Sequence, residues 1–449
     1  MGVVIETQMW EPSSFSFIFL FCCCISSIIL FPYFANTSGK SNSFFDLGSP
    51  FLRFQRRFLL VYSLASVIKG LGSVFGEFEY GYYGLSREWM VVTLSVGYAA
   101  SLLVGTFLGV LSDVIGHKKA CLLFCILHLL VGVLKSVTKN PSNWILTSCL
   151  AIASSISSFS FETWMVAEHE KLGHRKDLLN DTFWLMTFSE SVSLLGSQVH
   201  SNLLVGSSAE KGIVLPFTAA AVLSVLCAIY ISREWSGSSP ASGFWVYRRD
   251  FSAHILHDKM IWLLALAQAS LHFSTAIFWI LWAPTIVADG REVHLSMIYP
   301  CLLAARMFGS TAVPWFIGGP LSVTIEDFLS AAFAIAGLAL FIVAYDYQEI
   351  GVLVMLFCIF HACVGLISPS LARLRTMLVP VELRAGMISL SLAPANAAVL
   401  FILIQGGYYQ SLGNSTIMAF AAVASAGAAV CMHVLKRWRK QHDQNSHKF

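Results

Sequence analysis

Long apolar stretches alternate with short polar ones along the whole 449-residue chain. Twelve of these stretches have about 20 residues, enough to cross a hydrocarbon core of roughly 30 Å as a helix. They lie at 58–78, 89–112, 119–137, 144–165, 182–204, 213–231, 260–287, 296–317, 327–345, 350–372, 387–408 and 415–435. The longest polar interruption, 232–259, separates the sixth stretch from the seventh. The pattern predicts an all-α polytopic membrane protein with two six-helix halves, an arrangement typical of transporters.

One more apolar run, 15–34, precedes these twelve. It follows Glu6 and Glu11 rather than the basic residue that is typical of a cleaved signal peptide. We therefore predict a retained extra transmembrane helix, with cleavage as the alternative. The predicted division is an extra transmembrane segment and linker at 1–48, half-domains at 49–231 and 260–435, a central cytoplasmic loop at 232–259, and a basic cytoplasmic tail at 436–449.

The basic residues of the loops predict an orientation. Segments on one side hold twenty-one Lys and Arg residues, and segments on the other hold four, which are Arg87, Lys139, Lys211 and Arg291. Since Lys and Arg concentrate in cytoplasmic loops, the C-terminal tail is predicted to be cytoplasmic and the start of the first apolar run to lie outside. We expect an integral multi-pass protein, with the plasma membrane favoured and an endomembrane as the alternative.

Composition excludes several function classes. The chain is 56% hydrophobic and 12% charged, with a net charge of +3 spread over short loops, so nucleic-acid binding has no support. The eleven cysteines all lie in apolar segments, which argues against a disulfide framework or a zinc site. The loops contain no phosphate-binding or hydrolase motif, so we predict neither an enzyme nor an ATP-driven pump, and no cofactor.

Five ionisable side chains inside predicted spans are candidates for a substrate or ion path, because each costs about 2.5–3.5 kcal/mol at mid-membrane. They are Lys69, Glu190, His272, Arg306 and His361. Each has a structural alternative. Lys69 could be neutralised by an acid on a neighbouring helix, Glu190 could belong to a hydrogen-bonded polar face, and Arg306 could pair with Glu190 instead of meeting an anion. The two histidines could be ordinary core residues.

A motif joins the second and third core spans. It reads Gly109-Val110-Leu111-Ser112-Asp113-Val114-Ile115-Gly116-His117-Lys118-Lys119. Its glycines permit a tight turn and close helix approach, Asp113 suits a helix N-terminus or a basic partner, and Lys118 and Lys119 hold the loop on the cytoplasmic side. The motif is similar to the G-x-L-x-D-x-x-G-[RK]-[RK]-[RK] loop of the major facilitator superfamily. Glu162, at the end of the fourth core span, could carry a proton, but we favour a clamp on the cytoplasmic gate through a Lys or Arg of an adjacent loop.

Further blocks are more specific. They include Ser49-Pro50-Phe51-Leu52-Arg53-Phe54-Gln55, Leu60-Val61-Tyr62-Ser63-Leu64, Ser160-Phe161-Glu162-Thr163-Trp164 with Ala167-Glu168-His169, Leu281-Trp282-Ala283-Pro284, Ser368-Pro369-Ser370 and Arg384-Ala385-Gly386. With the 109–119 loop they resemble the molybdate-anion transporter family of that superfamily over most of 49–390. The family pattern has an Asp-Trp pair where this chain has Lys69-Gly70, and acidic residues where it has His272 and His361.

The resemblance implies uptake of molybdate by alternating access, with the oxyanion crossing between the two halves. We predict a secondary transporter of a small inorganic oxyanion, with molybdate favoured. Lys69 and Arg306 would attract the anion, while His272 and Glu190 are candidates for proton linkage. The alternatives are a carrier of a different anion and a transport-inactive receptor or scaffold. A channel has less support, because nothing indicates a repeated pore ring.

Overall fold

The computed structural model describes most of the chain. The described residues are 10–37, 50–82, 87–138, 142–173, 177–205, 214–235, 243–288, 291–317, 323–345, 349–408 and 411–446. Nearly all of them are helical, so the predicted fold class is confirmed.

Each predicted span coincides with a long helix within these residues. The first half contains α2 Pro50–Tyr82, α3 Arg87–Ala100 continued by η2 Ser101–Gly105 and α4 Thr106–Ile115, α5 His117–Val137, α6 Asn143–Lys171, α7 Asp177–Val205 and α9 Val214–Glu234. The second half contains α11 Lys259–Ile286, α12 Leu295–Ile317, α13 Ile325–Tyr345, α14 Ile350–Leu378, α15 Arg384–Ile402 continued by η6 Leu403–Tyr408, and α16 Asn414–Ser446. The extra N-terminal helix is α1 Ser14–Thr37.

Apolar length alone identifies nine of these as candidate spans among the described residues. The nine are Glu88–Ile115, His117–Val137, Asn143–Lys171, Val214–Glu234, Lys259–Ile286, Ile325–Tyr345, Ile350–Leu378, Val381–Gly407 and Asn414–Gln441. Helices α7 and α12 fall outside this set, and they carry Glu190 and Arg306. Because charged residues are costly in lipid, these two helices, and α2 with Lys69, are expected to face a polar interior.

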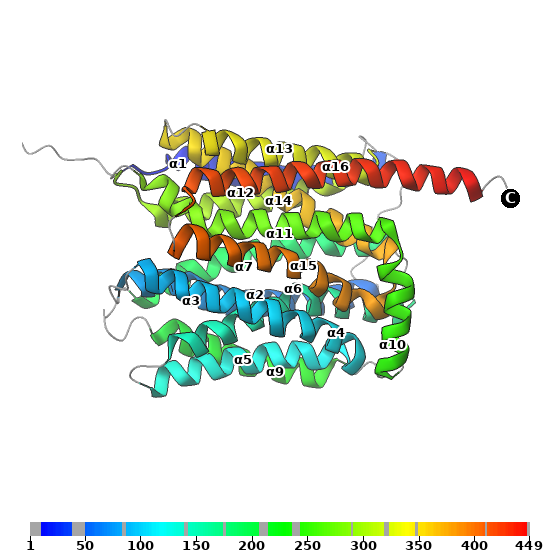
Figure 1. Cartoon of the computed structure of the whole chain (residues 1–449), viewed down its shortest axis with the longest axis horizontal. Helices are drawn as coiled ribbons and strands as arrows, with labels where there is room; N and C mark the ends of the chain where they lie inside the picture. The colour runs from blue at the N-terminus through cyan, green and yellow to red at the C-terminus, as the bar shows by residue number, and fades with distance from the viewer. Residues whose placement is uncertain are drawn as a thin grey trace, which may run out of the picture.

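The helices run roughly along one direction and form two groups (Figure 1). In the first half α5 packs on α9 and α2 packs on α7, while in the second half α16 packs on α11 and α13, and α12 packs on α14. The halves meet where α7 contacts α12 and where α4 contacts α15. The boundaries of the two halves stay a prediction.

The central segment is not a plain loop. Residues 244–256 form α10 Phe244–Phe251 and η3 Ser252–Leu256, and α10 lies across one end of the bundle (Figure 1). Residues 236–242, which hold most of the Ser- and Gly-rich run, lie outside the described residues. The end of the bundle that α10 covers is called the α10 end below.

The extra helix α1 packs along α12. Trp10 pairs through its backbone with the segment around Val293, just before α12 begins, and the Ser27 hydroxyl donates to the Thr311 carbonyl oxygen at 3.1 Å, further along both helices. The two helices therefore run parallel, and α1 begins at the end opposite α10. A topology of thirteen spans requires this direction of α1. Whether α1 is retained, and which end of the bundle faces the cytoplasm, stay predictions.

Candidate functional site

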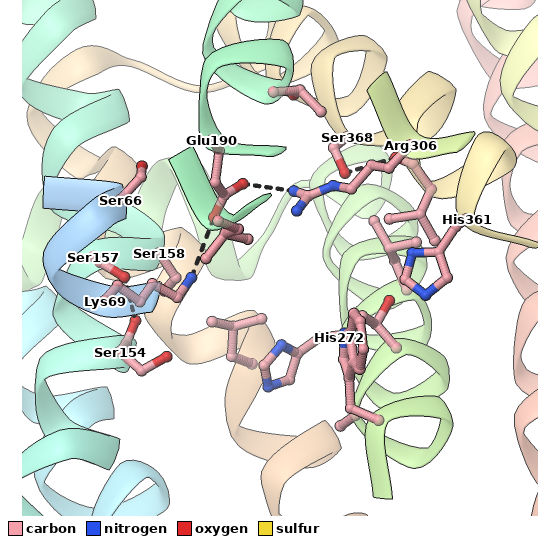
Figure 2. Close-up of a pocket in the computed structure, with 18 of the residues that line it drawn as sticks. Ser66, Lys69, Ser154, Ser157, Ser158, Glu190, His272, Arg306, His361 and Ser368 are labelled. Carbon is pink, nitrogen blue, oxygen red and sulfur yellow. Dashed lines mark hydrogen bonds and ion pairs between the residues drawn. The ribbon is translucent and has the colours of Figure 1, made fainter. Parts of the chain in front are cut away.

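A cavity of about 1220 Å³ lies between the two halves. All five ionisable residues predicted for the path line it, and Figure 2 draws their side chains around one space. Its wall also includes Met90 and Leu295, near the start of α3 and of α12, and Glu162 and Arg375, near the α10 end. The cavity therefore reaches from the end opposite α10 down to the Glu162–Arg375 pair.

Three of these residues form one ionic cluster. Glu190 on α7 accepts from Lys69 Nζ at 3.2 Å through Oε1 and from Arg306 Nη2 at 2.6 Å through Oε2 (Figure 2). The side chains of Glu190 and Arg306 are mostly buried, at 14% and 17% exposure, whereas Lys69 is one-third exposed to the cavity. We call Lys69, Glu190 and Arg306 the cationic triad.

The cationic triad joins both halves. Lys69 and Glu190 come from the first half and Arg306 from the second. Two cations share one carboxylate, so the triad carries one net positive charge in a space walled mostly by apolar side chains. The sequence left two alternatives for these residues, pairing with one another or lining the cavity, and the structure shows both.

Hydroxyl groups supplement the triad on the first half. Ser66 on α2 and Ser154, Ser157 and Ser158 on α6 line the cavity beside Lys69 (Figure 2). Ser66, Ser157 and Ser158 donate to carbonyl oxygens of their own helices, at 2.6–2.8 Å. A hydroxyl in this position can turn its hydrogen toward a ligand instead. Sequence reasoning missed the serines of α6, although their spacing of three and one residues marks one helix face.

The two histidines differ in their surroundings. Nε2 of His272 on α11 lies 3.0 Å from Oδ1 of Asn396 on α15, within the same half. His361 on α14 is only 1% exposed, and neither of its ring nitrogens has a hydrogen-bond partner among the described residues. No group of three or more His, Cys, Asp or Glu side chains in the described part of the chain is arranged to hold a metal ion.

The 109–119 motif closes the α10 end between the halves. Asp113, near the end of α4, is 5% exposed and accepts from the backbone N–H groups of Ala385 at 3.1 Å and Gly386 at 2.7 Å. These groups lie in the first turn of α15, where a helix N-terminus favours a carboxylate. Tyr247 of α10 donates a third hydrogen bond at 3.1 Å, and burial and then the Asp113 charge raise the pKa of this phenol, which keeps it a donor.

The other residues of the motif have separate tasks. A Cβ on Gly109 would lie 2.0 Å from Ser389 Oγ, so this glycine permits the close approach of α4 and α15. Gly116 has φ 102°, in the region that favours glycine, and links α4 to α5. Lys118 donates to the carbonyl oxygens of Ser232, in the last turn of α9, at 3.1 Å and of Trp235, just after α9, at 2.5 Å, whereas Lys119 is exposed.

Glu162 is also part of an inter-half contact. Arg375 on α14 donates to it through Nε at 2.9 Å and Nη2 at 2.5 Å, and donates through Nη1 to Gln268 Oε1 at 2.9 Å. The sequence had predicted a partner in an adjacent loop. The structure instead places the partner, Arg375, on a helix of the other half. The bidentate pair is almost fully buried, with the side chains of Arg375 and Glu162 8% and 12% exposed. It closes the cavity floor together with the Asp113 contacts.

Comparisons with known proteins agree with this architecture. Residues 17–356 match a family model described as sugar transporters with 12 TM. A protein named molybdate-anion transporter from Danio rerio is 24% identical over 426 residues, covering 86% of this chain and 87% of that protein. The protein of the same name from Xenopus tropicalis is 25% identical over 411 residues, covering 88% of each.

Solved structures show the same fold. The E. coli fucose:proton symporter superposes with a TM-score of 0.66 at 12% identity, over 85% of this chain and 98% of that one. A bacterial homologue of the iron transporter ferroportin, in an outward-facing state, gives 0.65 at 13% identity, over 86% and 99%. These neighbours and the family are transporters and not enzymes. The chain is a divergent relative of the molybdate-anion transporters and belongs to this twelve-span transporter family of the major facilitator superfamily.

Proposed function

We propose that the chain is a secondary carrier of a small inorganic oxyanion, with molybdate as the favoured substrate, and that it works by alternating access. One observation supports this most: two cations from opposite halves converge on a single carboxylate inside the cavity between the halves. Glu190 occupies the position that an anionic substrate would take. A substrate that replaces the carboxylate there would contact both halves at once.

The chemistry of the triad suits a tetrahedral dianion. Arg306 offers planar N–H donors that match oxyanion geometry, and Lys69 adds a compact ammonium charge. The apolar wall strengthens these contacts, because charge interactions gain strength where water is excluded. The serines around Lys69 supply neutral donors. The names of the relatives from Danio rerio and Xenopus tropicalis support molybdate as the anion.

The two contacts at the α10 end would be the gate. The positive-inside prediction assigns this end, and the C-terminal tail, to the cytoplasm. The cavity then opens toward the outside, and uptake requires that the Asp113 and Glu162 contacts break as the halves rock. The Glu190–Arg306 pair also joins the halves, so a substrate that releases it couples binding to this motion.

Proton linkage through His272 or Glu190 is part of the proposal. An unperturbed histidine titrates near pH 6.5, so we would compare uptake at about pH 5.5 and 7.5. Faster uptake at the lower pH in the parent protein but not in a His272→Gln variant would assign the linkage to His272.

The first test is molybdate accumulation in cells that express the chain, against empty-vector cells, with Lys69→Ala and Arg306→Ala variants alongside. Arg57→Ala is the control, because Arg57 is an exposed cation far from the cavity wall, at 64% exposure. The proposal expects uptake by the parent and by Arg57→Ala, and loss of most uptake in the other two. Equal uptake by all four would contradict the assignment of the triad.

A receptor or scaffold without transport is the second candidate, since the family resemblance implies an Asp-Trp pair at Lys69-Gly70 and acidic residues at His272 and His361, where this chain has none. Ligand-dependent stabilisation without accumulation in sealed vesicles would favour it.

A further inference from the structure

His361 is a buried imidazole with unused hydrogen-bonding capacity. Its side chain sits in a box of aromatic rings from α11 and α14. The ring centroids of Phe278, Trp279 and Phe360 lie 4.5, 5.0 and 5.6 Å from its own. Neither nitrogen has a partner among the described residues, although the ring forms part of the cavity wall. A buried polar group without a partner costs free energy, and an anion in the cavity that accepts from the ring would offset this cost.

Arg306 also has an unused hydrogen-bond donor. Its Nη2 is taken by Glu190, but its Nε has no partner in the described part of the chain. Figure 2 draws the Arg306 and His361 side chains on the same side of the cavity. A neutral imidazole carries one N–H donor.

Helix packing fixes these two residues relative to each other. A Cβ on Gly365 would lie 2.1 Å from the Arg306 carbonyl oxygen, and a Cβ on Gly309 would lie 2.0 Å from the Ala362 carbonyl oxygen. The two glycines bring the backbones of α12 and α14 into direct contact, one turn from Arg306 and from His361. The pair therefore moves as one unit with the second half.

We propose that His361 and Nε of Arg306 form an oxyanion subsite in the second half, where the imidazole N–H and the guanidinium N–H donate to oxygens of one bound anion. The inference rests on the proposed carrier function and adds a residue that determines affinity. Lys69 and the α6 serines contact the anion from the first half, so the subsite keeps hold of it while the Glu190–Arg306 contact between the halves is released.

Two substitutions of His361 distinguish a hydrogen-bonding role of the imidazole from a packing role. Phenylalanine at position 361 keeps a ring in the aromatic box but removes both nitrogens, whereas glutamine keeps an N–H donor but removes the ring. A donor role predicts that His361→Gln resembles the parent and His361→Phe is impaired. A packing role predicts the reverse order.

The test is concentration-dependent uptake of molybdate by full-length protein in cells, for the parent, His361→Phe and His361→Gln. His128→Phe is the matched control, since His128 is also buried at 4%, packs on an aromatic ring and has no partner for Nε2 among the described residues, but lies outside the cavity wall. Surface expression is measured for every variant.

We expect His361→Phe to raise the half-saturating molybdate concentration about tenfold or more, since a hydrogen bond to a charged group is lost, and His361→Gln and His128→Phe to stay within about threefold. Parent-like uptake by His361→Phe, or an impairment confined to His361→Gln, would overturn the subsite while leaving the carrier function intact. Absence of uptake by the parent for molybdate, sulfate and phosphate would overturn both.

Discussion

Replacing Glu190 with glutamine should tighten anion binding. The carboxylate is an internal competitor for the two cations of the triad, so an incoming anion must displace it. Glutamine preserves the size of the side chain and removes the charge. Lys69 and Arg306 then lose the carboxylate that they share in the empty protein, and a bound dianion can neutralise both.

The magnitude follows from the geometry. At separations of 3.2 and 2.6 Å, an effective dielectric constant of about 20 gives attractions of about 5 and 6 kcal/mol, most of which desolvation cancels. Breaking a buried pair costs a net 3–5 kcal/mol, and the low end of about 3 kcal/mol applies because Lys69 is one-third exposed. Since about 1.4 kcal/mol is a tenfold change in affinity, molybdate should bind Glu190→Gln on the order of 100-fold more tightly.

Thermal unfolding of the purified protein across a molybdate titration measures this. Without molybdate, Glu190→Gln should unfold at a lower temperature than the parent, and molybdate should restore it at concentrations that leave the parent unchanged. Glu234→Gln is the control, because it removes the acid of an exposed pair with Arg57. Equal or weaker molybdate affinity in Glu190→Gln would refute the view that Glu190 occupies the anion position.

Two further changes test the gate and the packing. Glu162→Gln should weaken the clamp with Arg375 by about 3 kcal/mol and populate the state that is open at the α10 end. In a protein without its native cysteines, Ala372→Cys should then react faster with a thiol reagent applied from the α10 end. An unchanged labelling rate would contradict the role of this pair in the gate. Gly309→Ala should lower thermal stability by about 1–3 kcal/mol, because the new Cβ would meet a backbone carbonyl of α14 at 2.0 Å, whereas Gly427→Ala, with nothing within 4 Å, should be neutral or stabilising. Equal stability of the two glycine variants would argue against the close contact.

The sequence was sufficient for the spans and for the five ionisable residues of the cavity. Lipid requires every backbone polar group to be satisfied within a helix, so apolar length is a strong signal. The same solvent makes Lys69, Glu190 and Arg306 costly outside a polar interior, which is why they could be singled out. Helices α7 and α12 illustrate both effects, since their polar residues line the cavity and they fall outside the purely apolar set.

Pairing between distant residues was harder to predict, and Glu190–Arg306 was the one pair for which the sequence analysis had named both partners. The acid that holds Lys69 is 121 residues further along the chain, and the base that holds Glu162 is 213 residues further. Asp113 accepts mainly from backbone N–H groups in the first turn of α15, in agreement with the helix N-terminus that the motif suggested, but the sequence did not indicate which helix. Helix α10 lies in a segment whose polar composition predicted a loop. Its Tyr247 donates the third hydrogen bond to Asp113.

Transport by the chain alone is the central claim, and purified protein in sealed proteoliposomes tests it most directly. The vesicles would be loaded without molybdate, given external molybdate, and compared with vesicles that contain Lys69→Ala or no protein. We expect molybdate to accumulate in the vesicles with the parent protein and to remain at the protein-free level with Lys69→Ala. Molybdate that stabilises the parent protein yet never enters the vesicles would contradict a carrier and identify a receptor instead.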